Sequence, residues 1–438
     1  MTASLLSPGD DEYDAARVPW NVAVQQQPAA VVAATSADDV ASAVQQARDR
    51  GLRIMLQNTG HAASHRHDLS DVLLIRTNGM TDVAVDVEAK VARVDAGVQW
   101  QAVADAAAPH GLAGLAGSSG GVGAVGYTLG GGIGWLGRAH GFACNRAVAA
   151  DVVLADGSTR RIDDENDPDL MWALRGGGGS FAAVTALEIG LVPAPVIYGG
   201  TLFFPAERAT EVLTAWRAWT DSVPETVTST GRVINVPPIP EAPEALRGKT
   251  FVIVQAVLLM AEVEASELLA PLRDLGPGMD TFAVMPANQL GAIHMDPPGP
   301  VPAALEGWLL HSFDDEEIAA VVANSGAGTP FVGLQVRHMG GAFTRPATHV
   351  GALDRVDEPF MMYAVGITPD AEVGKAVGGA LEALQSSLGG AVSSRRLMNF
   401  AEHVDTSALH TADAGAKLAE VRATYDPDRV FVAAHDIG

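Results

Sequence analysis

The chain has 438 residues, with 28 Lys and Arg against 52 Asp and Glu, so its formal net charge is −24. One hydrophobic core rarely serves more than about 250–300 residues, so this length predicts two lobes. The hydrophobic fraction of 48% excludes general disorder, and the acidic balance argues against a nucleic-acid or anionic-membrane partner. The single cysteine, Cys144, excludes an intramolecular disulfide framework.

The start of the chain carries no targeting signal that we recognise. Residues 1–20 contain an acidic run where a signal peptide would have basic residues. No uninterrupted apolar run of about 18 residues predicts a transmembrane helix. We therefore expect a soluble, cytoplasmic protein.

Strands and helices alternate in the first part of the chain. Residues 29–35 predict a strand, and Ser36 with Asp39 predicts the capped start of a helix that ends at Gly51. Further strands are predicted over 53–57, 72–76, 82–86 and 90–97, and a helix over 98–111. A hairpin over 147–163, a helix over 167–176 and a strand within 177–193 follow the glycine-rich segment 111–141.

The pattern changes after Pro195. From about 196 to 390, long apolar strands alternate with amphipathic helices, which favours one large sheet covered by helices on one face. The run 252–261 is the longest apolar stretch and predicts a buried strand. The last residues predict a helix that is stopped by Asp426-Pro427, followed by a short apolar strand.

Three glycine clusters lie in the first 195 residues. Gly121 to Gly126 fits the G-x-G-x-x-G pattern, but no strand directly precedes it and Gly130–Gly132 follows at once, so we reject a Rossmann loop. The third cluster, 176–179, follows a predicted helix. Glycine is costly for folding, so the clusters indicate backbone N–H groups that approach one extended anionic or flat cofactor.

Histidines gather just after the strand over 53–57. His61, His65 and His67 could in principle bind a metal ion, but they lie in a predicted loop that lacks a thiolate. We therefore predict no metal site. His65 and His67 fit ordinary surface histidines.

Taken in order, these segments resemble the FAD-binding domain of the vanillyl-alcohol-oxidase superfamily, and especially its berberine-bridge-enzyme-like branch. The resemblance rests on residues 26–54, on Thr59-Gly60-His61, on 121–148, on the hairpin and on 169–189. The late segments 396–400 and 425–431 also fit, whereas the middle of the chain fits loosely.

The resemblance implies an α+β fold: a two-subdomain, PCMH-type FAD-binding domain and a substrate lobe with a large, mostly antiparallel sheet covered by helices. We expect the FAD-binding domain at 21–195, the substrate-binding domain at 196–390, and a segment at 391–438 that returns to the first domain. The family histidine that attaches to the flavin 8α-methyl falls on His61. FAD would thus be bound through one covalent link.

The resemblance also implies the residues that surround the cofactor. Asn399, in the late Asn-Phe motif, is expected to contact it, and Val122 falls on the position that controls oxygen access. The remaining expected contacts are Gln57, Asn58, Thr59, Gly60 and Ala62 at the pyrophosphate, Ser118, Ser119, Gly123, Gly126, Tyr127, Gly130, Gly131 and Gly132 at the ring and ribityl chain, and Gly179 and Val184 near the adenine.

This chain departs from the family pattern at several positions. Ser119 stands where bicovalent members have a cysteine, so no thioether can form, and Cys144 lies too far downstream to replace it. Tyr127 replaces a common histidine, and Leu397 replaces a common tyrosine. No carboxylate follows Gly340-Gly341, where plant members place the catalytic base.

The proton acceptor therefore has to come from other residues. Arg337, His338, Tyr363, Asn399, Glu402 and His403 lie on or after strands expected to face the flavin ring. Because side chains alternate along a strand, only one of Arg337 and His338 can face the flavin. We take His338, Tyr363, Tyr127 and Glu402 as the catalytic candidates, with His338 first because a neutral imidazole suits proton transfer.

The predicted function is an FAD-dependent oxidase. A small or medium organic substrate, of the alcohol, sugar or secondary-metabolite type, would transfer hydride to flavin N5, and O2 would reoxidise the flavin to give H2O2. A valine at position 122 favours oxygen access. Two alternatives stay open: a dehydrogenase with another electron acceptor, and a flavin-holding cyclase or binding protein without net redox turnover.

Overall fold

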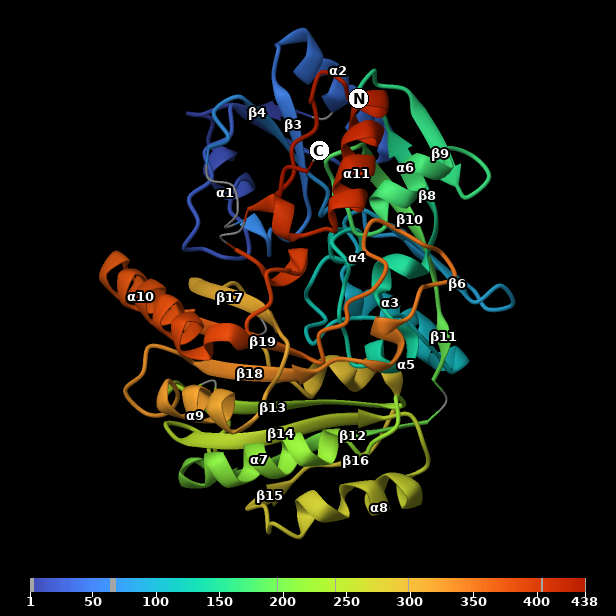
Figure 1. Cartoon of the computed structure of the whole chain (residues 1–438). Coiled ribbons are helices and arrows are strands. Elements are labelled where there is room, and N and C mark those ends of the chain that lie inside the picture. Colours follow the sequence, from blue (N-terminus) through green and yellow to red (C-terminus); the bar gives the residue numbers. More distant parts are fainter. Residues whose placement is uncertain are drawn as a thin grey trace.

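The computed structural model describes residues 4–63, 68–194, 196–240, 242–297, 299–402 and 405–437. Figure 1 shows two halves: one holds both chain termini, and the other is built on a broad sheet that runs across the molecule. Within the described residues, no helix has the length and apolar content needed to cross a membrane.

A small sheet near the termini positions the loop that carries His61. Its order is β1-β2-β4-β3, with β2, β4 and β3 parallel. The N-cap of α2 is Ser36, whose hydroxyl accepts from the Asp39 N–H, as expected, but the Asp39 carboxylate accepts from the Thr35 N–H rather than from Ser36. The elements are β1 (Leu5–Leu6), α1 (Tyr13–Ala16), β2 (Ala30–Ala33), α2 (Ala37–Asp49), β3 (Arg53–Gln57) and β4 (Val72–Arg76).

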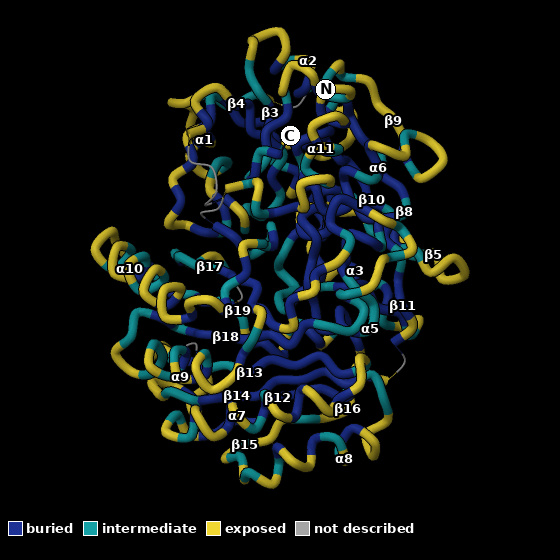
Figure 2. The backbone as a smooth tube through the Cα atoms, in the orientation of Figure 1, coloured by how far each residue is buried: buried dark blue, intermediate teal, exposed yellow. Residues whose placement is uncertain are grey.

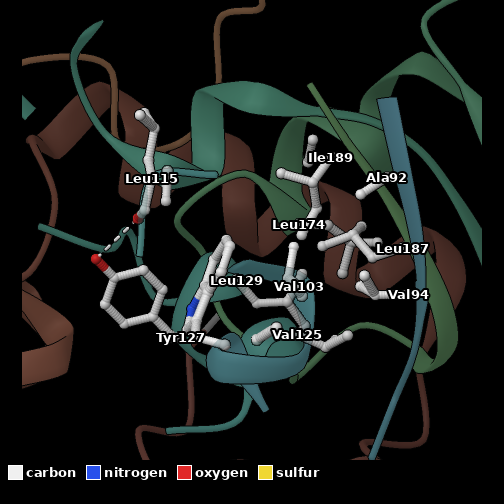
Figure 3. Close-up of a cluster of buried hydrophobic side chains, with 14 of the residues drawn as sticks. Ala92, Val94, Val103, Leu115, Val125, Tyr127, Leu129, Leu174, Leu187 and Ile189 are labelled. Atoms are coloured by element: carbon white, nitrogen blue, oxygen red, sulfur yellow. Dashed lines mark hydrogen bonds between the residues drawn. The ribbon is translucent and has the colours of Figure 1, made fainter. Parts of the chain in front are cut away.

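A second, five-stranded antiparallel sheet completes this half, in the order β5-β6-β10-β8-β9. Its inner face packs on α3, α4 and α6 around buried side chains such as Val103, Leu129 and Leu187 (Figure 3). The elements are β5 (Val83–Asp86), β6 (Val91–Asp95), α3 (Trp100–Ala107), α4 (Ala124–Leu129), β8 (Ala147–Val153), β9 (Thr159–Asp163), α6 (Pro168–Leu174) and β10 (Ala183–Gly190).

The other half is one antiparallel sheet in the order β15-β12-β14-β13-β18-β19-β17, with β16 paired to β12. Four helices, α7 to α10, cover one of its faces, so its central strands are buried (Figure 2). The elements are β12 (Ile197–Pro205), α7 (Ala209–Thr220), β13 (Val227–Asn235), β14 (Thr250–Leu258), α8 (Glu262–Arg273), β15 (Met279–Asp280), β16 (Ala283–Met285), β17 (Ala303–Leu310), α9 (Asp315–Ala323), β18 (Gly333–His338), β19 (Phe360–Ile367) and α10 (Ala371–Leu388).

The chain finally returns to the half that holds the termini. Helix α11 (Ala412–Tyr425) lies beside α6 (Figure 1), and Phe431 pairs with Ile54 next to β3. Two short elements connect the halves: α5 (Gly137–His140) packs near the start of β13, and β7 (Leu112–Ala113) pairs with β11 (Val192–Pro193).

Sequence patterns missed two kinds of element. Helix α4 was interpreted as part of a glycine-rich loop, although it contains one buried turn of apolar residues. Strands β13 and β17 and helix α9 were not assigned, because polar residues interrupt their apolar periodicity. Helix α4 and strands β13 and β17 line or support the candidate site.

Candidate cofactor and substrate site

The large sheet presents a polar face toward the glycine-rich segment. Along β18, Val336 faces the helix layer, whereas Gln335 and Arg337 face the opposite way. Register pairs Arg337 with Thr230 on β13, and Gln335 with Tyr363 on β19. The Arg337 guanidinium reaches the carbonyl of Ile133 at 3.5 Å, which places this face against residues that follow Gly132.

His61 lies just beyond the end of β3. Its ring stacks on Trp20, with a centroid distance of 4.3 Å and an interplanar angle of 19°, and its Nδ1 lies 2.7 Å from the Thr59 hydroxyl. Gly60 adopts the left-handed region at φ 80°, which turns the chain there. Burial lowers the pKa of His61 to about 4, although the charge of Asp296 opposes the shift. The imidazole is therefore neutral at neutral pH.

The residues that precede His61 are held from several sides. The Gln57 and Gln26 amides bond each other at 3.1 Å. Asn58 donates from Nδ2 to the Val98 carbonyl at 3.2 Å, while its buried Oδ1 has no partner among the described residues. Ala62 is exposed.

The segment 118–126 brings backbone close to this loop. Ser118 donates from its hydroxyl to Asp296 at 3.1 Å, and Ser119 and Val122 are partly buried. Gly123 is the N-cap of α4, and a Cβ there would lie 2.7 Å from Asn58 Nδ2. A Cβ at Gly126 would meet no atom within 4 Å, so this side of α4 is open.

Asn399 holds the second glycine cluster. Its Oδ1 accepts from the Gly132 N–H at 2.8 Å, and its Nδ2 donates to the Tyr127 carbonyl at 3.3 Å. Gly131 and Gly132 have φ values of 119° and 78°, and a Cβ at Gly130 would lie 2.7 Å from Asn399 Nδ2. Asn399 therefore positions the glycine cluster.

Tyr127 points into the core beneath the glycine cluster. Its hydroxyl donates to the Leu115 carbonyl at 3.2 Å (Figure 3), and its ring meets Trp100 edge-on at 5.6 Å. Burial raises its pKa well above the ordinary value, although Arg337 opposes the shift. A phenol whose proton serves the backbone is a poor proton acceptor, so we do not retain Tyr127 as a catalytic candidate.

The third cluster and its strand lie deeper in the same half. A Cβ at Gly179 would approach no atom closer than Ala433 Cβ at 3.9 Å. Val184 lies on β10, pairs with Val152 and is buried in the core of the second sheet. Contact with an adenine at either position stays a prediction.

His338 ends β18, where it packs near Phe360 of the helix-covered core and also borders the space lined by Ser118, Trp135 and Arg337. Its ring packs near Phe360 at 5.8 Å, and Arg138 Nη1 lies 2.7 Å from its Nε2. Burial lowers the pKa of His338 to about 3, and the positive charges of Arg138 and Arg217 add to the shift. Since the cation takes the basic nitrogen, His338 lacks a free lone pair, and the structure argues against it as the base.

Tyr363 and Glu402 remain candidates at the polar face. Tyr363 is partly buried and packs edge-on against Phe400 at 5.3 Å. Burial raises its pKa above the ordinary value, and the negative charge of Glu402 adds to this. Glu402 is buried, and its N–H donates to the Glu306 carboxylate at 3.3 Å. His65, His67 and His403 lie outside the described residues, and no metal-binding group of three or more ligands occurs within those residues.

Sequence reasoning missed a pair at this face, the buried His294 and the partly buried Asp296. His294 Nδ1 lies 2.6 Å from Asp296 Oδ1, and its Nε2 lies 2.6 Å from Gln335 Oε1. Burial would raise the pKa of Asp296, but His294, Arg232 and Ser118 together lower it. Met295, at φ 62°, turns the chain so that its two neighbours reach the same site. Only this strained backbone, which no sequence pattern reveals, brings them together.

These residues fit an FAD. The backbone at Gly126 leaves room that a side chain would fill, and Asn58 Oδ1 is a buried acceptor with no described partner. No side chain caps the start of α4, and its first N–H, of Ala124, donates to the Val98 carbonyl at 2.8 Å. The loop over 57–62, α4 and the cluster over 130–132 would hold the cofactor.

Comparison with known proteins agrees with this geometry. Residues 28–163 match the model of an FAD binding domain. The chain is 29% identical to (R)-6-hydroxynicotine oxidase of Paenarthrobacter nicotinovorans over 44% of its length, and 35% identical to glucooligosaccharide oxidase of Sarocladium strictum over 41%. These alignments cover 43% and 36% of the relatives, so the chain spans less than half the length of either.

Solved structures share the fold over almost the whole chain. The 6-hydroxy-D-nicotine oxidase from Arthrobacter nicotinovorans has a TM-score of 0.83 at 22% identity, covering 98% of this chain and 96% of its own. Berberine bridge enzyme from Eschscholzia californica has a TM-score of 0.82 at 17% identity, and the match covers 100% of this chain and 96% of that enzyme's chain. These likenesses establish the mixed helix and sheet architecture.

Proposed function

We propose that this chain is a PCMH-type FAD oxidoreductase of the berberine-bridge-enzyme-like group and acts as an FAD-dependent oxidase of a small or medium organic substrate. The match of residues 28–163 to an FAD binding domain carries the proposal. When bound, FAD accepts a hydride from a substrate carbon that bears an alcohol or amine and passes the electrons to O2, which gives H2O2. The residues of the chain bind the cofactor, orient the substrate and take its proton.

His61 is proposed as the covalent attachment point of the flavin. The neutral imidazole has a nucleophilic nitrogen, and both Trp20 and Thr59 fix its orientation. Ser119 offers no thiol, so one link is expected. Acid precipitation of the purified protein should give a yellow pellet, and a peptide that spans His61 should carry the mass of FAD. A colourless pellet with free FAD in the supernatant would contradict the link.

Tyr363 and Glu402 are proposed to handle the substrate proton. Both lie at the polar face of the sheet, whereas the Nε2 lone pair of His338 is taken by Arg138. Proton transfer by a positioned side chain contributes about 10²–10⁴-fold to the rate. Tyr363→Phe or Glu402→Gln should therefore slow single-turnover flavin reduction by that factor, while His338→Gln should reduce at close to the normal rate. Wild-type rates in both of the first two variants would overturn the assignment.

Val122 is proposed to keep a path for oxygen open beside the cofactor. It is partly buried, and its carbonyl accepts from the Trp100 N–H at 3.0 Å. Val122→Ile adds one methylene group and should slow reoxidation by O2 markedly while substrate reduces the flavin normally. Equal slowing of both half-reactions would indicate a general packing defect, since overfilling a core costs about 1–3 kcal/mol.

The activity itself can be tested with purified holoenzyme. Names of the relatives point to hydroxylated amines and oligosaccharides as first substrates to try, with stopped-flow flavin reduction and peroxide detection as the two measurements. Reduction without peroxide formation would favour a dehydrogenase. Stable holoenzyme that no substrate reduces would favour a flavin-holding cyclase or binding protein.

A further inference from the structure

A hollow lies between the glycine-rich segment and the polar face of the large sheet. Ser118, Ile133 and Trp135 form one wall, and Thr228, Thr230 and Arg337 form the opposite wall. The hollow therefore has one wall on each half of the molecule.

Four polar atoms of the lining residues are buried without a hydrogen-bond partner in the described part of the chain: Trp135 Nε1, Thr230 Oγ1, Arg337 Nε and His338 Nδ1. Their residues are 4%, 3%, 8% and 9% exposed. The indole and guanidinium nitrogens can only donate, a threonine hydroxyl can also donate, and His338 Nδ1 carries the ring proton because Nε2 accepts from Arg138. Buried donors are normally satisfied, so four of them around one hollow call for an acceptor from outside the chain.

The charges around the hollow also indicate an acceptor from outside the chain. Arg337 makes only a long contact, 3.5 Å, with the Ile133 carbonyl, and it lies over the Phe400 ring at 5.0 Å. Within the described ranges, no carboxylate lies at ion-pair distance from this guanidinium. Asp296 lies nearby, but its oxygens are bonded to Ser118 and His294. A buried cation without an anionic partner is costly, so a bound anion would compensate it.

We propose that this hollow is the subsite for a carboxylate, or a similar oxyanion, carried by the substrate. Arg337 supplies the charge and a directed N–H, while Thr230 and Trp135 donate to the remaining oxygen lone pairs. The proposal rests on the proposed function in taking the ligand to be the molecule that is oxidised. Acceptor oxygens of the flavin ring are the other possible source of the same chemistry, and the experiment separates the two.

The test uses FAD-loaded protein and calorimetric titration with benzoate and its uncharged isostere benzamide. We expect benzoate to bind at least 10-fold more tightly than benzamide. Arg337→Met should weaken benzoate at least 10-fold and leave benzamide nearly unchanged, while Arg337→Lys and Thr230→Val should each weaken benzoate about 3–10-fold. Arg345→Met, which removes a surface arginine paired with Glu225, should bind both ligands as the wild type does.

Three results would overturn the proposal. One is equal binding of benzoate and benzamide to the wild type. The second is unchanged benzoate affinity in both Arg337→Lys and Thr230→Val, a result that can be obtained even if Arg337→Met fails to fold. The third is a loss of FAD affinity or a shifted flavin spectrum in the Arg337 variants with benzoate preference intact, which would assign the donors to the flavin ring. If no substrate reduces the holoenzyme while the benzoate preference persists, the proposed function fails and the oxyanion site stands.

Discussion

At the scale of single residues, burial keeps two histidines neutral with opposite consequences. His61 stacks on Trp20 at the edge of the candidate cofactor site, where a neutral ring can react. His338 is neutral because burial, and then the charges of Arg138 and Arg217, lower its pKa, and Arg138 occupies the nitrogen that could accept a proton. The same side chain thus suits attachment in one place and structure in the other, and its neighbours decide which.

The pKa of His61 predicts how covalent attachment depends on pH. The imidazole titrates at about 4 in the folded protein, so the neutral, nucleophilic form persists down to that pH. Incorporation of FAD into apoprotein should therefore run at a nearly constant rate from pH 8 to pH 5 and fall as pH approaches 4. The fraction of flavin retained after acid precipitation measures it. His61→Ala should bind FAD only reversibly, whereas His110→Ala, on an exposed turn, should attach it normally. An attachment rate that falls already near pH 6.5 would contradict the lowered pKa of His61.

The pKa of His338 predicts a loss of stability in acid. Its folded-state pKa, about 3, lies below the ordinary 6.5, so the unfolded chain binds more protons between these values. The contribution of His338 to the free energy of unfolding is fully present above pH 6.5. It is lost as the pH drops toward 3, by up to about 1.4 kcal/mol per pH unit. His338→Gln should remove the contribution of this one proton to the pH dependence of the unfolding free energy, while its amide oxygen still accepts from Arg138. Urea unfolding at pH 7 and pH 5 checks it, and an unchanged slope would refute it.

At the scale of elements, the glycine clusters work by close approach between segments far apart in the chain. Asn399, near the C-terminal end, fills the space beside Gly130 and bonds Gly132 and Tyr127. Any side chain at Gly130 would displace this amide. The glycine requirement at position 130 therefore comes from a neighbour about 270 positions away, whereas Gly131 and Gly132 also adopt positive φ values that favour glycine.

Gly130→Ala should consequently damage both stability and FAD binding. The new Cβ would lie 2.7 Å from Asn399 Nδ2, so the amide must move and release the Gly132 N–H. We expect a loss of about 1–3 kcal/mol in unfolding free energy, as for other overpacked sites, together with weaker FAD binding. Gly415→Ala in helix α11, where a Cβ meets nothing within 4 Å, is the matched control and should stabilise the protein by up to about 1 kcal/mol. Thermal unfolding and FAD titration measure both. Equal behaviour of the two variants would rule out the close-contact explanation.

At the scale of the whole molecule, one buried arginine joins the two halves. Arg138 comes from α5 beside the glycine-rich segment and donates to the Val227 carbonyl at 2.8 Å, to the Met339 carbonyl and to His338. These partners lie at the start of β13 and at the end of β18, two central strands of the large sheet. Burial lowers the pKa of Arg138 to about 10, although Glu225 opposes this, so it stays charged at neutral pH. The hollow and its polar walls depend on this alignment of the halves.

Arg138→Met should uncouple the halves. It leaves two buried carbonyls without a donor, which predicts a loss of about 2–4 kcal/mol. Calorimetry should show a lower midpoint and a broader or divided transition, and added FAD should stabilise only part of it. Arg345→Met, at an exposed ion pair, should change the transition little. A single sharp transition at the wild-type midpoint would show that Arg138 does not hold the halves together.

The sequence alone determined the architecture and the cofactor class. Alternating apolar residues and capping signals predicted strands over 53–57 and 72–76, and these coincide with β3 and β4. The three glycine clusters indicated one extended cofactor, and the resemblance to the vanillyl-alcohol-oxidase superfamily identified it as FAD, which the match over 28–163 supports. Such features depend on local chemistry and spacing, so they can be read along the chain.

The tertiary structure alone decided which polar residues meet. Both His338 and Arg337 lie at the end of β18 and line the same hollow. Only the structure shows that Arg138 occupies His338 Nε2, whereas Arg337 Nε has no partner in the described part of the chain. The partners Asp296, Thr230 and Arg138 come from separate segments with no shared motif. Burial, pairing across the sheet and the approach of the two halves set their pKa values and their roles, because these depend on neighbours in space that local sequence does not encode.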